Sequence, residues 1–124
     1  MRFNETDLQG HVNFAQYLNF FDLAIVEYMR SLDYDYQHML AEGVDMLYVD
    51  AHTTYHSPAQ FDEIIRLHCR IGKVGNTSLR YDIQIFSNAD DRLIATGEIS
   101  AVTAEQGTWK KLRVPNTIRQ AAVD

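Results

Sequence analysis

Several residue types that other protein classes depend on are scarce in this chain. Cysteine occurs once, at Cys69, so no disulfide can form within the chain and a reducing compartment fits. There are only two prolines, Pro58 and Pro115, and no low-complexity tract that would mark a linker. No apolar run approaches the length of a membrane span, and no signal-peptide pattern opens the chain. These absences predict one domain over residues 1–124 and a cytoplasmic location.

Positive charge is also scarce. The chain has 11 Lys and Arg against 17 Asp and Glu, a net charge of −6 and a pI near 5.2. Nucleic acids and anionic membranes attract basic surfaces, so neither is an expected partner, although a local basic patch could bind an anionic small molecule. Hydrophobic residues, at 46%, are abundant enough to build a core.

The segment from Asp7 to Phe14 contains a carboxylate, a glycine and the start of a helix. Asn13 is a natural N-cap, and the capping pattern predicts a helix from about Phe14 to Ser31. The first-turn N–H groups, including that of Phe14, lack intrahelical partners and favour a developing negative charge. Asp7 is not needed as the cap, so it is a candidate functional acid. The alternative is structural, because an Asp three residues before Gly10 is also typical of a type I turn.

The predicted helix over 14–31 has an apolar face so broad that we expect neighbours on most of its sides. A shorter helix is predicted over 34–42, ending at Gly43. Alternating apolar residues then predict strands over about 44–57, 65–71, 79–85, 93–103 and 108–114, and a short strand is expected at 1–5. A terminal helical turn is expected after Pro115, through Ala122.

These elements predict an α+β fold in which an antiparallel sheet curls around the first helix. Strands this long leave exposed edges, and pairing with a second copy would cover them. We therefore expect a homodimer or a dimer of dimers.

Four motifs resemble the hotdog-fold acyl-CoA thioesterases of the 4-hydroxybenzoyl-CoA thioesterase type, and together they cover nearly the whole chain. They are Thr6-Asp7-Leu8-Gln9-Gly10-His11-Val12-Asn13-Phe14-Ala15-Gln16-Tyr17-Leu18, Phe21-Asp22-Leu23-Ala24 with Glu27-Tyr28, Tyr55-His56-Ser57-Pro58-Ala59, and Gly75-Asn76-Thr77-Ser78. The resemblance implies a hotdog fold, dimers joined at sheet edges, a site at the subunit interface and an acyl-CoA substrate. No cofactor is implied.

The resemblance also implies roles for individual residues. Asp7 matches the family's aspartate, which acts as a nucleophile or as a general base for water. The Phe14 backbone N–H matches the amide that polarises the carbonyl. His11 and Tyr17 are weaker catalytic candidates, the latter more typical of core packing, and Gly10 and Asn13 are assigned to substrate binding.

Positive charge and hydrogen-bond donors are needed for the CoA phosphates. The resemblance places them at one turn, formed by Lys73, Asn76, Thr77, Ser78 and Arg80. Other basic residues are alternatives, namely Arg66, Arg70, Lys110, Lys111 and Arg113. Aromatic residues could shape the acyl pocket for an aromatic or a medium-chain group, namely Tyr17, Phe20, Phe21, Tyr48 and Tyr55.

This chain departs from the family pattern in two ways. A subgroup has a histidine at the position of Phe14, so a histidine-assisted route at that position is not open here. Relatives also carry several more residues before the first strand, which suggests that Met1 is a late start or that the chain has been trimmed.

Other chemistries fit the sequence less well. Asp22 and Glu27 on the long helix are alternative acids, although a solvated or paired carboxylate is the simpler interpretation. His52 and His56 share a strand face but lie about 13 Å apart, too far for one metal ion, and no metal site is expected. Cys69 follows the apolar phase of its strand and is interpreted as core.

Two other function classes stay open. One is a module that binds acyl-CoA or acyl-carrier protein without catalysis, since fold does not fix function. The other is a hotdog dehydratase, which is weaker because we find no paired Asp/His signature. The acid at Asp7 favours an enzyme, a thioester hydrolase.

Overall fold

The computed structural model describes residues 14–59 and 63–123. In chain order its elements are α1 (Phe14–Ser31), α2 (Tyr36–Ala41), β1 (Val44–Tyr55), β2 (Ile65–Val74), β3 (Ser78–Ser87), β4 (Leu93–Glu105) and α3 (Asn116–Val123). The described strands pair antiparallel in the order β1-β4-β3-β2. The strand expected at 1–5 lies outside the described residues.

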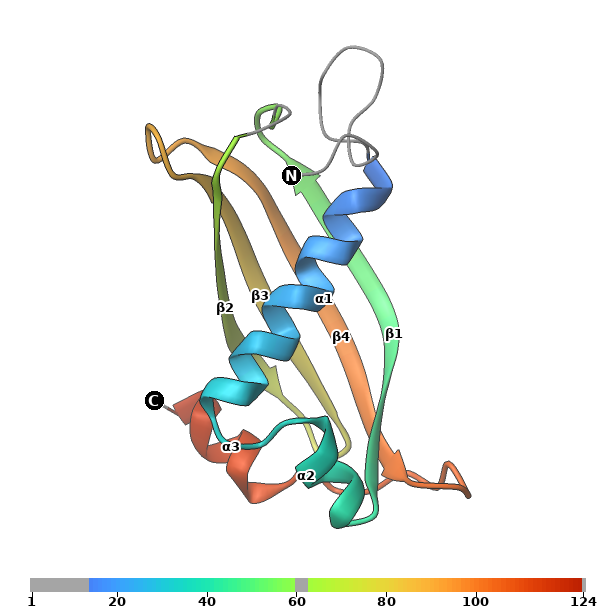
Figure 1. Ribbon diagram of the computed structural model, residues 1–124. Helices are drawn as coiled ribbons and strands as arrows, with labels where there is room; N and C mark the ends of the chain where they lie inside the picture. Colours follow the sequence, from blue (N-terminus) through green and yellow to red (C-terminus); the bar gives the residue numbers. More distant parts are fainter. Residues whose placement is uncertain (1–13, 60–62, 124) are drawn as a thin grey trace.

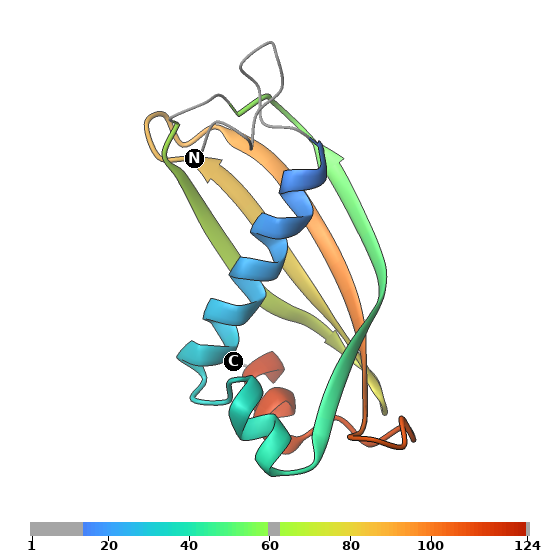
Figure 2. The ribbon, with the colours of Figure 1, turned by 45° about the vertical axis from the view of Figure 1, so that its right-hand side comes forward.

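Helix α1 crosses one face of the curved sheet, while α2 and α3 gather near its C-terminal end (Figure 1). The turned view in Figure 2 shows α1 lying along the hollow of the sheet. This is the α+β hotdog arrangement that the sequence predicts, and the predicted fold class is confirmed. None of the described helices combines the length and the apolar character needed to cross a membrane.

Helix α1 begins and ends at the predicted residues, but its surroundings differ from the expectation. Its sheet-facing side is buried and consists of Tyr17, Phe21, Ala24, Ile25 and Met29, spaced three and four residues apart. Three apolar side chains of the same helix are 45–51% exposed, namely Leu18, Leu23 and Val26. Among the described residues, the expectation of neighbours on most sides is therefore not met, because the described strands cover only one side of the helix.

The inner face of the sheet carries the apolar residues of the alternating strands. Ile83, Ile85 and Ile99 are buried against the helix layer, whereas Gln84 and Glu98 point to the outer face. Cys69 is half-buried at the margin of this core. Burial raises its pKa to about 12, and the nearby Asp82 charge adds to the shift.

Two predicted elements differ in the structure. The second helix is shorter, because Asp35 is its N-cap and accepts a hydrogen bond from the His38 N–H at 3.0 Å. The strand expected at 108–114 was wrong, since only an isolated bridge joins Ala104 to Lys111. Positive φ values at Gly107 (90°) and Trp109 (58°) bend the backbone there and prevent an extended strand.

The antiparallel strands give the molecule two ends, which we call the helix-start end and the α3 end. The helix-start end holds the first turns of α1, the end of β1 and the β3–β4 turn. The α3 end holds α2, α3 and the β2–β3 turn (Figure 1). Since β3 has 10 residues and runs from one end to the other, the ends are about 30 Å apart.

Candidate functional site

The first part of the candidate site is the start of α1. Phe14 is the first helical residue, so its backbone N–H belongs to the first turn, whose N–H groups lack intrahelical acceptors. The other predicted residues of this part lie outside the described residues, namely Asp7, Gly10, His11 and Asn13. Their contacts with the helix start therefore stay predictions.

Tyr17 lies one turn after Phe14 and is packed in the core. Its ring makes edge-to-face contacts with Tyr55, with centroids 4.9 Å apart, and with Phe20, at 6.1 Å. Burial raises the pKa of Tyr17, which a backbone hydrogen bond at Ala59 partly offsets. The phenol is therefore neutral at physiological pH, and its surroundings fit the packing role given as the more typical one.

Arg92 is a residue of the helix-start end that sequence reasoning missed. Its Nη2 lies 2.6 Å from Glu63 Oε1 and 3.2 Å from the Pro58 carbonyl, and its Nε donates to Ser57 Oγ at 3.0 Å. It thus fastens the segment leading to Ala59, on which Tyr17 rests. No local pattern could reveal these three contacts, because Ser57, Pro58 and Glu63 lie 29–35 residues away, and only the ion pair with Asp90, at 3.3 Å, is local.

The second part of the candidate site is the β2–β3 turn at the α3 end. Lys73 and Arg80 are paired neighbours across β2 and β3, and Asn76, Thr77 and Ser78 lie between them. The Arg80 guanidinium already binds the Asp82 carboxylate at 2.8 and 3.2 Å. Lys73 is exposed, so it presents the freer charge of the two.

The alternative basic residues separate into two groups. Backbone hydrogen bonding from Val114 N–H to the Asn76 carbonyl, at 2.9 Å, places the segment over 110–114 against the β2–β3 turn. The exposed cations of that segment, Lys110, Lys111 and Arg113, therefore join Lys73 at the α3 end. Arg66 lies at the opposite end, paired with Asp91 at 2.8 Å, and Arg70 lies midway along β2.

One chain does not bring the two predicted parts of the site together. The start of α1 and the β2–β3 turn lie at opposite ends of the sheet (Figure 1). Helix α1 alone spans about 27 Å over its 18 residues. Within one chain the two parts are therefore too far apart to meet at one thioester.

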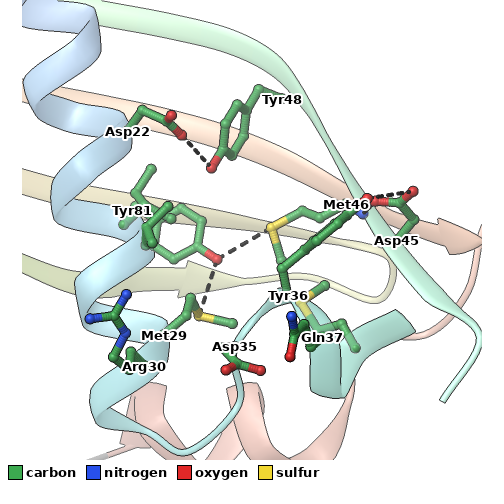
Figure 3. A pocket seen from close by; sticks show the side chains of 13 residues that line it. Asp22, Met29, Arg30, Asp35, Tyr36, Gln37, Asp45, Met46, Tyr48 and Tyr81 are labelled. Atoms are coloured by element: carbon green, nitrogen blue, oxygen red, sulfur yellow. Dashed lines mark hydrogen bonds between the residues drawn. The ribbon is translucent and has the colours of Figure 1, made fainter. Parts of the chain in front are cut away.

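A cavity of about 500 Å³ opens between α1, α2 and β1 (Figure 3). Its inner wall includes Ile25 and Met29 of α1, Met46 of β1 and Tyr81 of β3. The fully buried Tyr81 hydroxyl points between two thioether sulfurs, 3.5 Å from Met29 Sδ and 3.3 Å from Met46 Sδ. The interior is therefore mostly apolar, and burial raises the pKa of Tyr81.

The rim of this cavity is polar. The Tyr48 hydroxyl donates to Asp22 Oδ1 at 3.3 Å, as Figure 3 shows. Burial and then the Asp22 charge raise the pKa of Tyr48 to about 12. Of the aromatic residues considered for an acyl pocket, Tyr48 lines this cavity, whereas Tyr17 and Phe21 are core residues facing the sheet.

The alternative acids on α1 both have partners. Asp22 accepts from Tyr48, and Glu27 forms an exposed ion pair with Arg30 at 3.2 Å. Both contacts fit the interpretation of these carboxylates as paired rather than catalytic. Within residues 14–59 and 63–123, no three His, Cys, Asp or Glu side chains are grouped to hold a metal ion.

Comparison with known proteins gives matches over nearly the full chain. The model of the thioesterase-like superfamily matches residues 1–122. A protein of Escherichia coli O6:H1 named acyl-CoA thioester hydrolase YbgC is 27% identical over 116 residues, which cover 94% of this chain and 86% of that protein.

Solved structures agree with the fold. Slr0204, a 1,4-dihydroxy-2-naphthoyl-CoA thioesterase from Synechocystis, superposes with a TM-score of 0.88 at 21% identity, covering 100% of this chain and 91% of that chain. SAV2348 from Staphylococcus aureus, solved in complex with CoA, gives a TM-score of 0.88 at 16% identity over 99% of this chain and 77% of that one. The resemblance seen in the sequence is confirmed, and with it the expectation of a thioester hydrolase. The chain belongs to the thioesterase-like superfamily.

Proposed function

We propose that this protein hydrolyses small-molecule acyl-CoA thioesters to a free acid and CoA. Asp7 either attacks the thioester carbonyl, giving a mixed anhydride that water then hydrolyses, or activates a water molecule to attack the carbonyl directly; in both routes CoA leaves as the thiolate and takes up a proton. The Phe14 backbone N–H donates to the carbonyl oxygen as negative charge develops on it. His11 and Tyr17 are secondary candidates, and Gly10 and Asn13 shape the loop that receives the substrate.

The observation that carries this proposal is the start of α1 at Phe14. The residue that the resemblance assigns to carbonyl polarisation is thus a first-turn residue of an 18-residue helix, where the dipole and an N–H without an intrahelical acceptor favour an anion. That position follows from capping chemistry alone, independently of the resemblance.

We further propose that the active form is a homodimer, or a dimer of dimers, joined along β1. Among the described strands, β1 is an edge strand of 12 residues with pairing to β4 on one side only. Its side chains Leu47 and Val49 are 42% and 60% exposed. The exposed apolar side of α1 borders the cavity beside β1, because Val26 belongs to both.

Two-fold pairing of one strand with its own copy is antiparallel. Such a pairing sets the helix-start end of one protomer beside the α3 end of its partner. Asp7 and Phe14 of one protomer would then share a site with the β2–β3 turn of the other. The dimer thereby removes the separation of about 30 Å that one chain imposes.

The acyl group is proposed to enter the cavity between α1, α2 and β1. Its apolar interior and volume of about 500 Å³ suit a small acyl chain or ring. In the dimer this cavity lies on the side toward the partner's helix start. The nucleotide end of CoA is assigned to the turn formed by Lys73, Asn76, Thr77, Ser78 and Arg80.

A cytoplasmic location, suggested by the single cysteine, stays a prediction.

The second candidate function is a module that binds acyl-CoA or acyl-carrier protein without cleaving the thioester. The polar rim and apolar interior of the cavity would suit such a role too. Thiol release from short, medium, long and aromatic acyl-CoAs separates the two. Turnover of any of these substrates supports the hydrolase, and tight CoA binding without thiol release supports the module.

A further inference from the structure

We propose that Arg119 is a positioning residue that makes the β2–β3 turn a phosphate-binding element. It holds the turn so that the backbone N–H groups of Asn76 and Thr77 face outward, where they bind the phosphates at the nucleotide end of CoA. This inference rests on the proposed function, since it deepens the role given there to the turn.

The contacts of Arg119 converge on the carbonyl groups of the turn. From α3, its Nη2 donates to the Gly75 carbonyl at 2.8 Å and to the Asn76 carbonyl at 3.0 Å. Its Nε donates to the Val114 carbonyl at 3.0 Å, which fixes the guanidinium plane against the segment before α3. A planar guanidinium with several directed N–H groups is suited to such a clamp, which a lysine ammonium reproduces only in part.

Backbone hydrogen bonds also hold the carbonyls of the turn, one from the C-terminal segment and one from β4. Val114 N–H donates to the Asn76 carbonyl at 2.9 Å, and Thr103 N–H donates to the Thr77 carbonyl at 2.9 Å. The usual closing bond of a tight turn, from Ser78 N–H to the Gly75 carbonyl, is replaced by the bond from Arg119. The Gly75 and Asn76 carbonyls are thus directed toward the C-terminal segment, and the Thr77 carbonyl is directed toward β4.

This arrangement determines where the amides point. The described residues include no cis peptide bond, and in a trans peptide the C=O and N–H vectors are opposed. Since the Gly75 and Asn76 carbonyls face Arg119, the N–H groups of Asn76 and Thr77 face away from it. Neither has a hydrogen-bond acceptor within the described part of the chain, and the Asn76 residue itself is exposed.

The charge around the turn suits a phosphate. The tip of the turn, residues 75–78, carries no cation of its own, and the Arg80 charge is already paired with Asp82. Arg119 contacts carbonyls and, among the described residues, forms no ion pair, so its positive charge stays uncompensated behind the turn. Lys73 and the exposed cations over 110–113 flank it. Main-chain N–H groups that donate to an anionic oxygen form strong, charge-assisted bonds.

A purely structural role for Arg119 is the competing explanation, in which it only attaches α3 to the sheet. The two differ in what the variant would lose. If the role is only structural, the variant should bind every ligand more weakly or none of them. If Arg119 positions the turn, the variant should bind phosphate-carrying ligands more weakly and pantetheine, which has no phosphate, as the wild type does.

The test compares binding of CoA and of pantetheine to the full-length wild type, Arg119→Gln and Arg119→Lys. Gln120→Ala, an exposed neighbour on α3, controls for changes in the helix, and Arg119→Lys, which keeps the positive charge, separates loss of the clamp from loss of one charge. We expect the Kd for CoA to rise about tenfold or more in Arg119→Gln and by less in Arg119→Lys. The Kd for pantetheine should be the same in every variant, and Gln120→Ala should bind both ligands as the wild type does. In the wild type, CoA but not pantetheine should shift the amide resonances of Asn76 and Thr77.

Equal losses for CoA and pantetheine, or an unchanged Kd for CoA, would overturn the inference. If Arg119→Gln does not fold, the amide titration of the wild type decides. Amide resonances of Asn76 and Thr77 that do not shift when CoA is added would reject the inference. A wild type that binds CoA with these shifts but cleaves no thioester would contradict the proposed function and leave the inference standing. Thioester cleavage without amide shifts on adding CoA would support the proposed function and reject the inference.

Discussion

The ring of Phe21 lies directly over Gly97, where α1 crosses the middle of the sheet. A Cβ atom built on Gly97 would lie 2.7 Å from Phe21 Cζ, closer than real Cβ contacts allow. Phe21 is only 1% exposed, so it has no free space into which it could move. The absence of a side chain at Gly97 therefore sets how closely the helix approaches β4.

Replacing Gly97 with alanine should destabilise the fold, because the added methyl group overpacks the contact with Phe21. We expect the free energy of unfolding to fall by about 1–3 kcal/mol, measured by urea denaturation. Ser100→Ala, on the same strand but on the outer face, is the matched control and should change it by less than about 0.5 kcal/mol. A Gly97→Ala protein as stable as the wild type would show that the helix yields without cost.

Cys69 should react slowly in the folded protein. Its pKa of about 12 keeps the thiol protonated below that pH, and the thiolate is the reactive form. The thiol of the unfolded chain titrates near 8.5. The contribution of the buried protonated thiol to the free energy of unfolding is therefore complete below about pH 8.5 and is lost as the pH rises toward 12.

A disulfide reagent at pH 8 reports this single thiol without ambiguity. Labelling of the folded chain should be at least about a hundredfold slower than labelling in concentrated urea. Similar rates in the two states would mean that β2 leaves Cys69 accessible and its pKa ordinary.

Filling the cavity should narrow the range of acyl groups accepted. Met46 faces the cavity, and Met46→Phe replaces its flexible thioether with a rigid ring. We expect kcat/KM for benzoyl-CoA or decanoyl-CoA to fall about tenfold, with acetyl-CoA changed by less than about twofold. Ile64→Phe adds a ring at an exposed position away from both the cavity and β1, and should spare both substrates. Equal losses for small and large acyl groups would argue against this cavity as the acyl site.

The dimer should depend on the exposed edge of β1. Val49→Asp places a charge on each copy of the edge, and the two copies would repel each other where the strands meet. Sedimentation equilibrium should show a dimer for the wild type and a dissociation constant at least about tenfold higher for the variant. Ile64→Asp, also exposed but away from β1, is the control. A monomeric wild type, or a dimer whose dissociation constant is unchanged by Val49→Asp, would contradict the proposed dimer along β1.

Much of the fold was predictable, because its signals are local. The capping pattern in the sequence and the apolar spacing predicted both ends of α1, and Gly43, with φ of 77°, follows the second helix as predicted. The strand over 108–114 failed because alternation alone could not reveal the left-handed backbone at Trp109. The open side of α1 was misjudged because an apolar face does not say whether its neighbour lies in the same chain or in another.

The candidate site was predictable in its parts but not in its layout. Motif residues identified the helix start and the β2–β3 turn, but nothing local indicated that they lie at opposite ends of one chain. Arg92 and Arg119 escaped notice because each acts on segments about 30 or more residues away. An isolated arginine in a sequence does not reveal which carbonyl groups it will meet.

The central claim is that Asp7 carries out thioester hydrolysis, and one measurement tests it most directly. Thiol release is followed from the best acyl-CoA of the panel, with the wild type beside Asp7→Asn, and the dimer is checked for both. Asparagine keeps the shape but cannot attack the carbonyl or activate water, so we expect turnover to fall by about a hundredfold or more. Turnover near the wild-type level in an intact Asp7→Asn dimer would contradict the account and move the chemistry to another residue.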